Sequence, residues 1–206
     1  MTQRRTNLER RTETRSRLLE SAAEVFARRG YAAASVSEIV DGAGCSTGAL
    51  YAHFEGKSDL FLSLMDETIP GWAGYYGQGV DATESLDDAL RVVAARWAAL
   101  VDKRPEQWTL FVEFWSVAVR DKSLTPEFAE RYADIRGAMA TLVAGMAQQF
   151  SLELDESADT LAAIVLALAD GLAMQRLANP NEVSEELFLN ALRIVFAAAS
   201  GAGDRP

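Results

Sequence analysis

Apolar residues recur at helical spacing along the chain, and the first clear case lies between Thr14 and Gly30. Four apolar residues stand there at positions i, i+3, i+4 and i+7: Leu19, Ala22, Ala23 and Phe26. Charged residues fall off this stripe, and Gly30 stands where a helix commonly ends. The pattern predicts an amphipathic helix over residues 14–30.

Two short helices follow, joined by a glycine-bearing turn. Ser35 and Glu38 have the spacing of a capping box, which predicts a helix that starts after Ser35 and stops near Gly42–Gly44. Ser46 is suited to cap a second short helix that reaches about Phe54. Two short helices joined in this way predict a helix-turn-helix.

The rest of the chain carries further helical patterns bounded by proline, glycine or capping residues. These predicted helices cover residues 58–69, 85–103, 105–120, 126–150, 156–178 and 185–200. The sequence has no alternating strand pattern of useful length. We therefore expect an all-α fold of about nine helices.

Composition agrees with a globular protein in a reducing compartment. Of 206 residues, 49% are apolar and 24% charged, which excludes collagen-like and wholly disordered chains. One cysteine excludes an internal disulfide, and one cysteine with one histidine cannot make a four-ligand zinc site, so we expect no metal and no cofactor. No signal peptide is visible, and the longest nearly apolar run, 161–174, contains Asp170 and is too short to span a bilayer. We expect a cytoplasmic protein.

Charge is unevenly distributed along the chain. Residues 1–66 carry nine Lys or Arg and nine Asp or Glu, whereas residues 67–206 carry eleven and twenty-one. A basic N-terminal segment on an acidic body is expected when only one end meets phosphate. The pairs Arg4/Arg5 and Arg10/Arg11 would form a flexible basic arm in an adjacent minor groove or, alternatively, a solvated tail.

One stretch of the sequence carries a family pattern. It reads SVSEIVDGAGCSTGALYAHFEGKSDL over residues 35–60, and Phe26, Gly30 and Tyr31 precede it at matching spacing. The first 65 residues or so thus resemble the TetR family of bacterial transcription regulators. The resemblance implies a helix-turn-helix DNA-binding domain over residues 1–57 and a ligand-binding and dimerisation domain over residues 58–206. It also implies a ligand-responsive regulator, usually a repressor, that a small hydrophobic effector releases from DNA.

A recognition helix presents its N-terminal side chains to base edges, and its flanks meet phosphates. The candidate DNA contacts are Ser46, Thr47 and Gly48 for bases, Tyr51, His53 and Lys57 for phosphates, and in addition Ser35. Thr47 offers a hydroxyl and a methyl group where the family often has Lys or Arg, so the operator sequence cannot be transferred from relatives. Plain surface side chains are the alternative for Tyr51, His53 and Lys57.

Aromatic residues are concentrated in the part of the sequence that follows the predicted helix-turn-helix. All four tryptophans fall between positions 72 and 115, and the predicted helix over 105–120 is apolar on most sides. The resemblance implies an aromatic-lined pocket, with ordinary core packing as the alternative. Because these residues are aromatic and apolar with few charges, we expect a hydrophobic effector that is planar or multi-ring. The candidate ligand-binding residues are Trp72, Tyr75, Trp97, Trp108, Phe111, Phe114, Trp115 and Tyr132.

The last two predicted helices are apolar nearly all round, which one monomer core does not easily cover. A two-fold contact between two copies would cover them and would supply the two helix-turn-helices that a palindromic operator needs. The candidate interface residues are Ala163, Ala167, Gly171, Leu187, Ala191 and Ile194. A monomer with an exposed apolar patch is the alternative. Asp170 is either a hydrogen-bonded buried carboxylate or a pocket contact.

A protein-binding adaptor and an enzyme are the two alternatives to a regulator. A helical adaptor that binds protein would not need the basic and aromatic residues of 46–57, which are intact. An enzyme has no motif in its favour, and the only cysteine and the only histidine, Cys45 and His53, both lie in the helix-turn-helix. We therefore expect a regulator, not an enzyme, whose partners are double-stranded operator DNA, a small-molecule effector and a second copy of the chain.

Overall fold

The computed structural model describes residues 6–68 and 71–200, without the side chains of residues 68 and 71–73. All regular elements in this described part are helices, so the predicted all-α fold is confirmed. In chain order they are α1 (Asn7–Ala33), α2 (Val36–Ala43), α3 (Thr47–Tyr51), α4 (Lys57–Thr68), α5 (Gly71–Gly77), α6 (Leu86–Lys103), α7 (Pro105–Arg120), α8 (Thr125–Gln149), α9 (Ala158–Ala178) and α10 (Glu185–Ala199). The helix α5 lies where the sequence predicted none.

Helix α1 begins seven residues earlier than the apolar stripe indicated. The Thr6 hydroxyl accepts a hydrogen bond from the Glu9 amide at 3.2 Å, and the Glu9 carboxylate accepts one from the Thr6 amide at 2.7 Å. This capping box starts the helix before Arg10 and Arg11, so a flexible arm is wrong for these two arginines. Arg4 and Arg5 lie outside the described residues.

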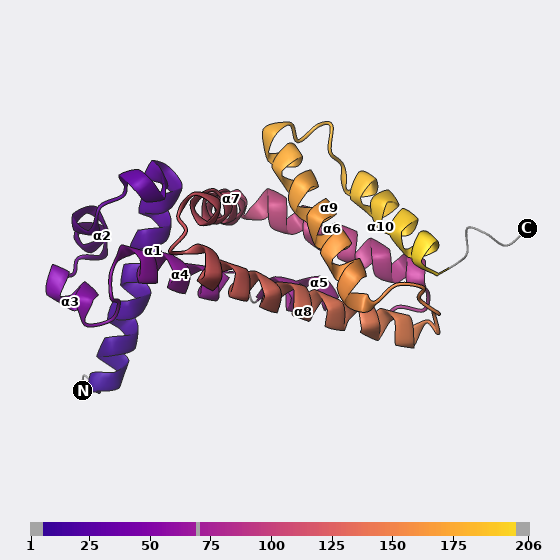
Figure 1. Ribbon diagram of the computed structural model, residues 1–206, viewed down its shortest axis with the longest axis horizontal. Helices are drawn as coiled ribbons and strands as arrows, with labels where there is room; N and C mark the ends of the chain where they lie inside the picture. Colours follow the sequence, from indigo (N-terminus) through magenta and orange to yellow (C-terminus); the bar gives the residue numbers. More distant parts are fainter. Residues whose placement is uncertain (1–5, 69–70, 201–206) are drawn as a thin grey trace, which may run out of the picture. The chain divides into compact units, whose positions relative to one another are not determined.

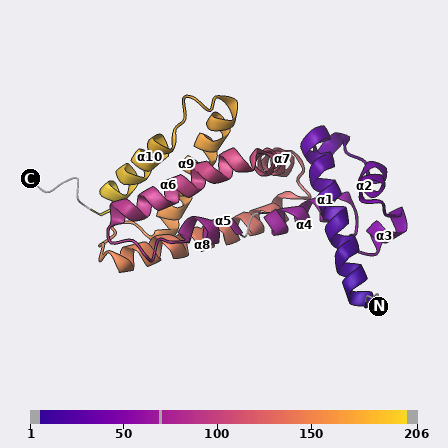
Figure 2. The same ribbon diagram turned by 180° about the vertical axis from the view of Figure 1, so that it is seen from behind.

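The chain forms two compact units. Unit 1 comprises Met1–Thr68 and Thr109–Ala129, and unit 2 comprises Ile69–Trp108 and Glu130–Pro206, so α7 and α8 each contribute residues to both. In unit 1, α1 packs against α2, α3 and α4 (Figures 1 and 2). Its core contains an aromatic chain in which the Phe61 ring lies 5.0 Å from that of Phe26 and 4.5 Å from that of Phe114. A functional boundary after residue 57 stays a prediction.

Unit 2 is built on α6, α9 and α10, which lie side by side in both ribbon views (Figures 1 and 2). Leu90, Val93, Leu192 and Phe196 are buried where α6 and α10 pack, and α5 also packs against α6. Burial of these side chains supplies the main stabilising free energy of such a bundle.

Among the described helices, α9 alone has the length and the mean hydropathy, 1.6, of a membrane span. About two fifths of that apolar window is buried in the protein, and a core helix of a soluble protein passes the same test. Hydropathy alone is therefore weak evidence that α9 spans a membrane.

Candidate nucleic-acid interface and ligand unit

Side chains from α1 and α2 fix the turn of the helix-turn-helix. The hydroxyl of Ser35 accepts a hydrogen bond from the Glu38 amide, and the Glu38 carboxylate accepts one from the Ser35 amide, both at 3.2 Å, so the predicted capping box is confirmed. The Ser35 hydroxyl also donates to this carboxylate at 3.1 Å, and this bond, followed by the one from the Ser35 amide, holds the pKa of Glu38 below its usual value. Gly44 ends α2 at φ 58°, where glycine is unstrained. The guanidinium of Arg17 donates to the carbonyls of Ala43 and Gly44 and ties this turn to α1.

Helix α3 presents a small polar face. Its cap is Ser46, whose hydroxyl accepts from the Ala49 amide at 3.1 Å. Thr47 and Gly48 are exposed, and Tyr51 is 57% exposed although it is a large aromatic side chain. These residues are available to a major groove, as a base-reading role requires. The contact with DNA itself stays a prediction.

The other side of α3 belongs to the core of unit 1. Leu50 and Phe54 are buried, and the guanidinium of Arg15 lies 5.4 Å from the centre of the Phe54 ring. His53 is half-buried just beyond α3, and its burial, followed by the positive charges of Arg11 and Arg15, lowers its pKa. In the free chain this favours the neutral imidazole, which can still donate one hydrogen bond.

Lys57 has a structural role that the sequence did not reveal. Its ammonium group donates to the carbonyl of Tyr31 at 2.8 Å and to that of Ala34 at 3.0 Å, with Ala32 at 3.5 Å. It also lies 4.5 Å from the centre of the Tyr31 ring, a cation–π contact. Lys57 thus binds the C-terminal end of α1 to the start of α4, and its predicted phosphate contact would compete with these bonds.

The same turn receives a carboxylate from α7. Gly30 interrupts the helical geometry of α1 at φ 72°, and the amide of Tyr31 after it donates to the Glu113 carboxylate. A Cβ at residue 30 would lie 3.2 Å from that carboxylate, so glycine permits both the conformation and the approach. Family spacing singled out Gly30 and Tyr31, but nothing in the sequence pointed to Glu113.

The structure divides the predicted aromatic pocket residues between the two units. Phe111, Phe114 and Trp115 belong to unit 1, whereas Tyr75, Trp97, Trp108 and Tyr132 belong to unit 2. The side chain of Trp72 lies outside the described residues. Trp97 is fully buried, donates its indole N–H to the Ala169 carbonyl at 3.2 Å, and packs its ring 4.5 Å from that of Phe188. For Trp97 this geometry favours ordinary core packing over a role in a ligand pocket.

A polar cluster lies inside unit 2 where α5, α8 and α9 supply one residue each. The Tyr132 hydroxyl donates to the Asp170 carboxylate at 2.9 Å, and burial, followed by the charge of Asp170, raises the pKa of the Tyr76 hydroxyl. Burial raises the pKa of Asp170 to about 6, although the hydrogen bond from Tyr132 acts in the opposite direction. Asp170 is therefore a hydrogen-bonded, half-buried carboxyl group.

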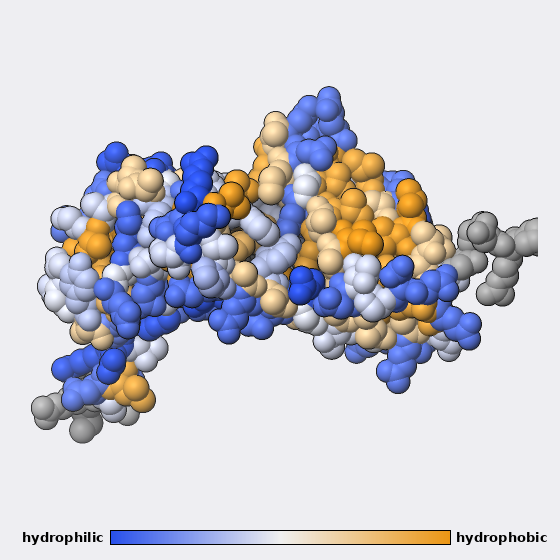
Figure 3. Space-filling view, in the orientation of Figure 1, coloured by the Kyte–Doolittle hydropathy of each residue, from blue (hydrophilic) through white to orange (hydrophobic). Residues whose placement is uncertain are grey.

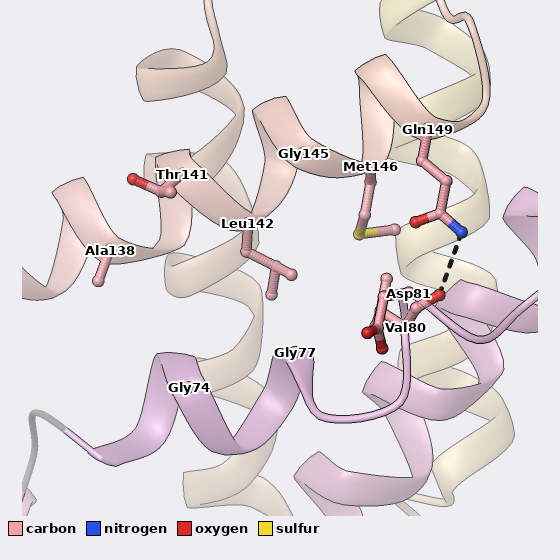
Figure 4. A pocket seen from close by; sticks show the side chains of 10 residues that line it. All are labelled: Gly74, Gly77, Val80, Asp81, Ala138, Thr141, Leu142, Gly145, Met146 and Gln149. Carbon is pink, nitrogen blue, oxygen red and sulfur yellow. Dashed lines mark hydrogen bonds between the residues drawn. The ribbon is translucent and has the colours of Figure 1, made fainter.

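Unit 2 also contains a groove that sequence reasoning missed. It has a volume of about 540 Å³ between α5 and α8, within the size range of small-molecule sites. Figure 4 shows its lining, which consists of Gly74, Gly77, Val80, Asp81, Ala138, Thr141, Leu142, Gly145, Met146 and Gln149. None of these was among the predicted ligand-binding residues, because α5 was not predicted and its pairing with α8 is a tertiary contact.

Comparison with known families decides the relationship that the helix-turn-helix suggested. Residues 18–64 match the family described as "Bacterial regulatory proteins, tetR family", and residues 86–199 match "BetI-type transcriptional repressor, C-terminal". The second match alone covers more than half of the chain. The chain belongs to the TetR family. This is a family of transcription regulators and not of enzymes.

Individual relatives match this TetR-family chain over only part of its length. It is 33% identical to the transcriptional activator FasR of Mycolicibacterium smegmatis over 110 residues. These residues make up 53% of this chain and 50% of that protein. Over 77 residues it is 41% identical to the transcriptional repressor KstR2 of Mycobacterium tuberculosis, 37% of this chain and 38% of that protein. The matches thus span half or less of these relatives' lengths, and they include both an activator and a repressor.

Solved structures agree on the fold. A transcriptional regulator from Rhodococcus sp. Rha1 superposes with a TM-score of 0.72 at 24% sequence identity, over 91% of this chain and 96% of that one. At this identity the likeness shows the shared TetR-family fold.

The predicted dimerisation face of this TetR-family protein is apolar and exposed in the single chain. On α9, Ala163 and Ala167 are exposed and Gly171 is half-buried; on α10, Leu187 is 44% and Ile194 69% exposed, with Ala191 half-buried. Ile164 and Met174 extend the patch and were not predicted. Figure 3 shows a continuous hydrophobic area over these two helices. We call the α9–α10 surface formed by these eight residues the apolar face.

Proposed function

We propose that this TetR-family protein is a cytoplasmic transcription regulator that binds a two-fold symmetric DNA operator as a homodimer, through α3. The exposure of Thr47, Gly48 and Tyr51 above a buried Leu50 carries this proposal, because solvent-facing polar groups on a capped helix are what base reading requires. Arginines along the first half of α1 would supply charge for phosphates, although the whole chain has a net charge of −10.

The homodimer is supported by the apolar face. Exposed patches of this kind on a soluble chain commonly mark an interface. A second copy placed by a two-fold axis would cover the same residues on both chains, because such an interface is self-complementary. It would also pair two recognition helices for two half-sites.

Control by a small apolar effector bound in unit 2 completes the proposal. An effector can release DNA only by binding more tightly to the conformation that does not bind DNA. The coupling is reciprocal, so operator DNA should weaken effector binding by the same factor by which effector weakens DNA binding. We propose repression as the ordinary output.

Selection from random DNA duplexes tests this function. The purified full chain, at low salt and without effector, should enrich one palindromic sequence, and affinity for it should fall steeply with salt as counterions are released. Failure to enrich any sequence would overturn the proposal and would favour the alternative of an adaptor that binds protein.

A further inference from the structure

The groove between α5 and α8 is hollow on both sides of the point where these helices touch. A Cβ added at Gly77 would lie 3.1 Å from a methyl group of Leu142, so the two helices are in close contact there. A Cβ added at Gly74 or Gly145 would meet no atom within 4 Å in the described part of the chain. Among the described residues, therefore, no side chain fills the space over these two glycines.

The groove is elongated along α8. Its lining runs along α8 from Ala138 to Gln149, eleven residue steps or about 16 Å at 1.5 Å per residue. Figure 4 shows Gly74 and Gly77 of α5 facing this row of α8 residues. An extended, flexible molecule fits such a shape better than a compact one.

The lining has the chemistry of an aliphatic site. Of the ten lining residues in the described part of the chain none is aromatic, and its accessible aliphatic side chains are Ala138 and Leu142, since Val80 and Met146 are buried. Among the described residues this lining offers a planar ligand no aromatic ring to stack on, whereas an alkyl chain needs only apolar surface removed from water. This differs from the planar effector expected from the tryptophan-rich sequence.

One end of the groove is rich in hydrogen-bond acceptors. The amide nitrogen of Gln149 donates to the carbonyls of Val80 at 3.3 Å and Thr83 at 3.1 Å, which leaves its amide oxygen to accept. Asp81 is the only charged residue of the ten and lies at the same end (Figure 4). A carboxylate there would attract a cation and repel a second carboxylate.

We propose that the α5–α8 groove binds one alkyl chain with a cationic, hydrogen-bond-donating head group, the chain lying over Gly74 and Gly145 and the head group at Asp81. The inference rests on the proposed function, in which an effector binds in unit 2, and it names this groove as the binding site. A second copy of the chain is the weaker candidate as occupant, because the apolar face lies on other helices, α9 and α10.

Three probes of equal chain length test the head group: decylammonium, decanol and decanoate, each titrated calorimetrically into the full chain below its micelle concentration and without DNA. Decylammonium should bind saturably, one per chain, and decanoate at least about fivefold more weakly, because two unit charges 4 Å apart interact by about 1 kcal/mol in water. Asp81→Asn should remove most of this difference. Decanoate binding as tightly as decylammonium, or no saturable binding of any probe, would overturn the proposal.

Two glycine variants test the position of the chain. Gly145→Leu should fill the groove and abolish decylammonium binding, with Gly74→Leu as a second filling variant. Gly137→Leu is the matched control on α8, since a Cβ there also meets no atom within 4 Å but residue 137 does not line the groove. Circular dichroism shows that each variant is folded. Unchanged binding in both filling variants contradicts the proposed site.

The outcomes separate this inference from the proposed function. A protein that selects an operator but binds none of the probes remains a regulator whose effector site is not this groove. A protein that binds decylammonium but selects no operator has the groove site without the DNA-binding function.

Discussion

The ammonium group of Lys57 lies 2.8 Å from the carbonyl oxygen of Tyr31, the residue that follows the glycine interruption of α1. The sequence placed Lys57 among the phosphate contacts. In the structure its donors are directed at the carbonyls that end α1, which helical hydrogen bonding would otherwise leave unsatisfied. Lys57 therefore helps hold the helix-turn-helix to α4.

Replacing Lys57 should lower stability. Lys57→Met keeps the aliphatic stem but removes the charged donor, so the free energy of unfolding in urea should fall by about 1.5–3 kcal/mol, the range for a hydrogen bond to a charged group. Lys103→Met, on an exposed residue of α6, is the control and should stay within about 0.5 kcal/mol of the wild type. An unchanged urea midpoint for Lys57→Met together with weaker DNA binding would show that Lys57 contacts DNA phosphate and does not stabilise the fold.

Thr47→Ala should change base preference. Its methyl and hydroxyl groups are exposed at the start of α3, so their loss should alter discrimination at one position in each half-site by about 1–3 kcal/mol. Tyr51→Phe, which removes a predicted phosphate contact, should instead weaken all sequences about equally. The measurement is a set of binding titrations against operators with single base changes. Equal losses across all of them for Thr47→Ala would show that Thr47 reads no base.

Asp170 should make stability depend on pH. Its pKa is raised from 3.8 to about 6 in the folded protein. The protonated carboxyl group therefore contributes fully to the stability of the fold below about pH 4, and this contribution is lost as the pH rises through 6. Asp170→Asn carries no charge at any pH and should therefore gain stability relative to the wild type between pH 4 and 7.5, by at most about 3 kcal/mol.

Urea unfolding at several pH values measures this gain. Asp134→Asn, on an exposed residue of α8, is the control and should show the same difference from the wild type at every pH. A gain for Asp170→Asn that does not grow with pH would show that Asp170 titrates normally in the folded protein.

The apolar face should determine the oligomeric state. The wild type should sediment at about twice 22.4 kDa at micromolar concentration, and Ile194→Arg or Ala167→Arg should give monomers that no longer bind operator. Val119→Arg alters an equally exposed apolar side chain on α7 and should leave the dimer intact. A folded wild-type monomer at that concentration would contradict the proposed homodimer.

The sequence by itself determined the features that depend on local spacing. The capping box of Ser35 and Glu38 and the cap at Ser46 follow from interactions within a few residues, so pattern alone predicts them. The same holds for the all-α fold and for the apolar character of α9 and α10. It did not hold for the start of α1, because the polar capping box of Thr6 and Glu9 lies outside the apolar stripe.

Tertiary structure decided what depends on contacts between distant segments. Lys57 meets a turn 26 residues earlier, and Glu113 meets the same turn from 82 residues later. The tryptophans looked like one cluster in sequence, yet folding assigns residues around 108 and 111 to different units and buries Trp97 against Phe188. Likewise, a groove between α5 and α8 exists only once both helices are placed, because small residues reveal empty space only when the neighbouring atoms are known.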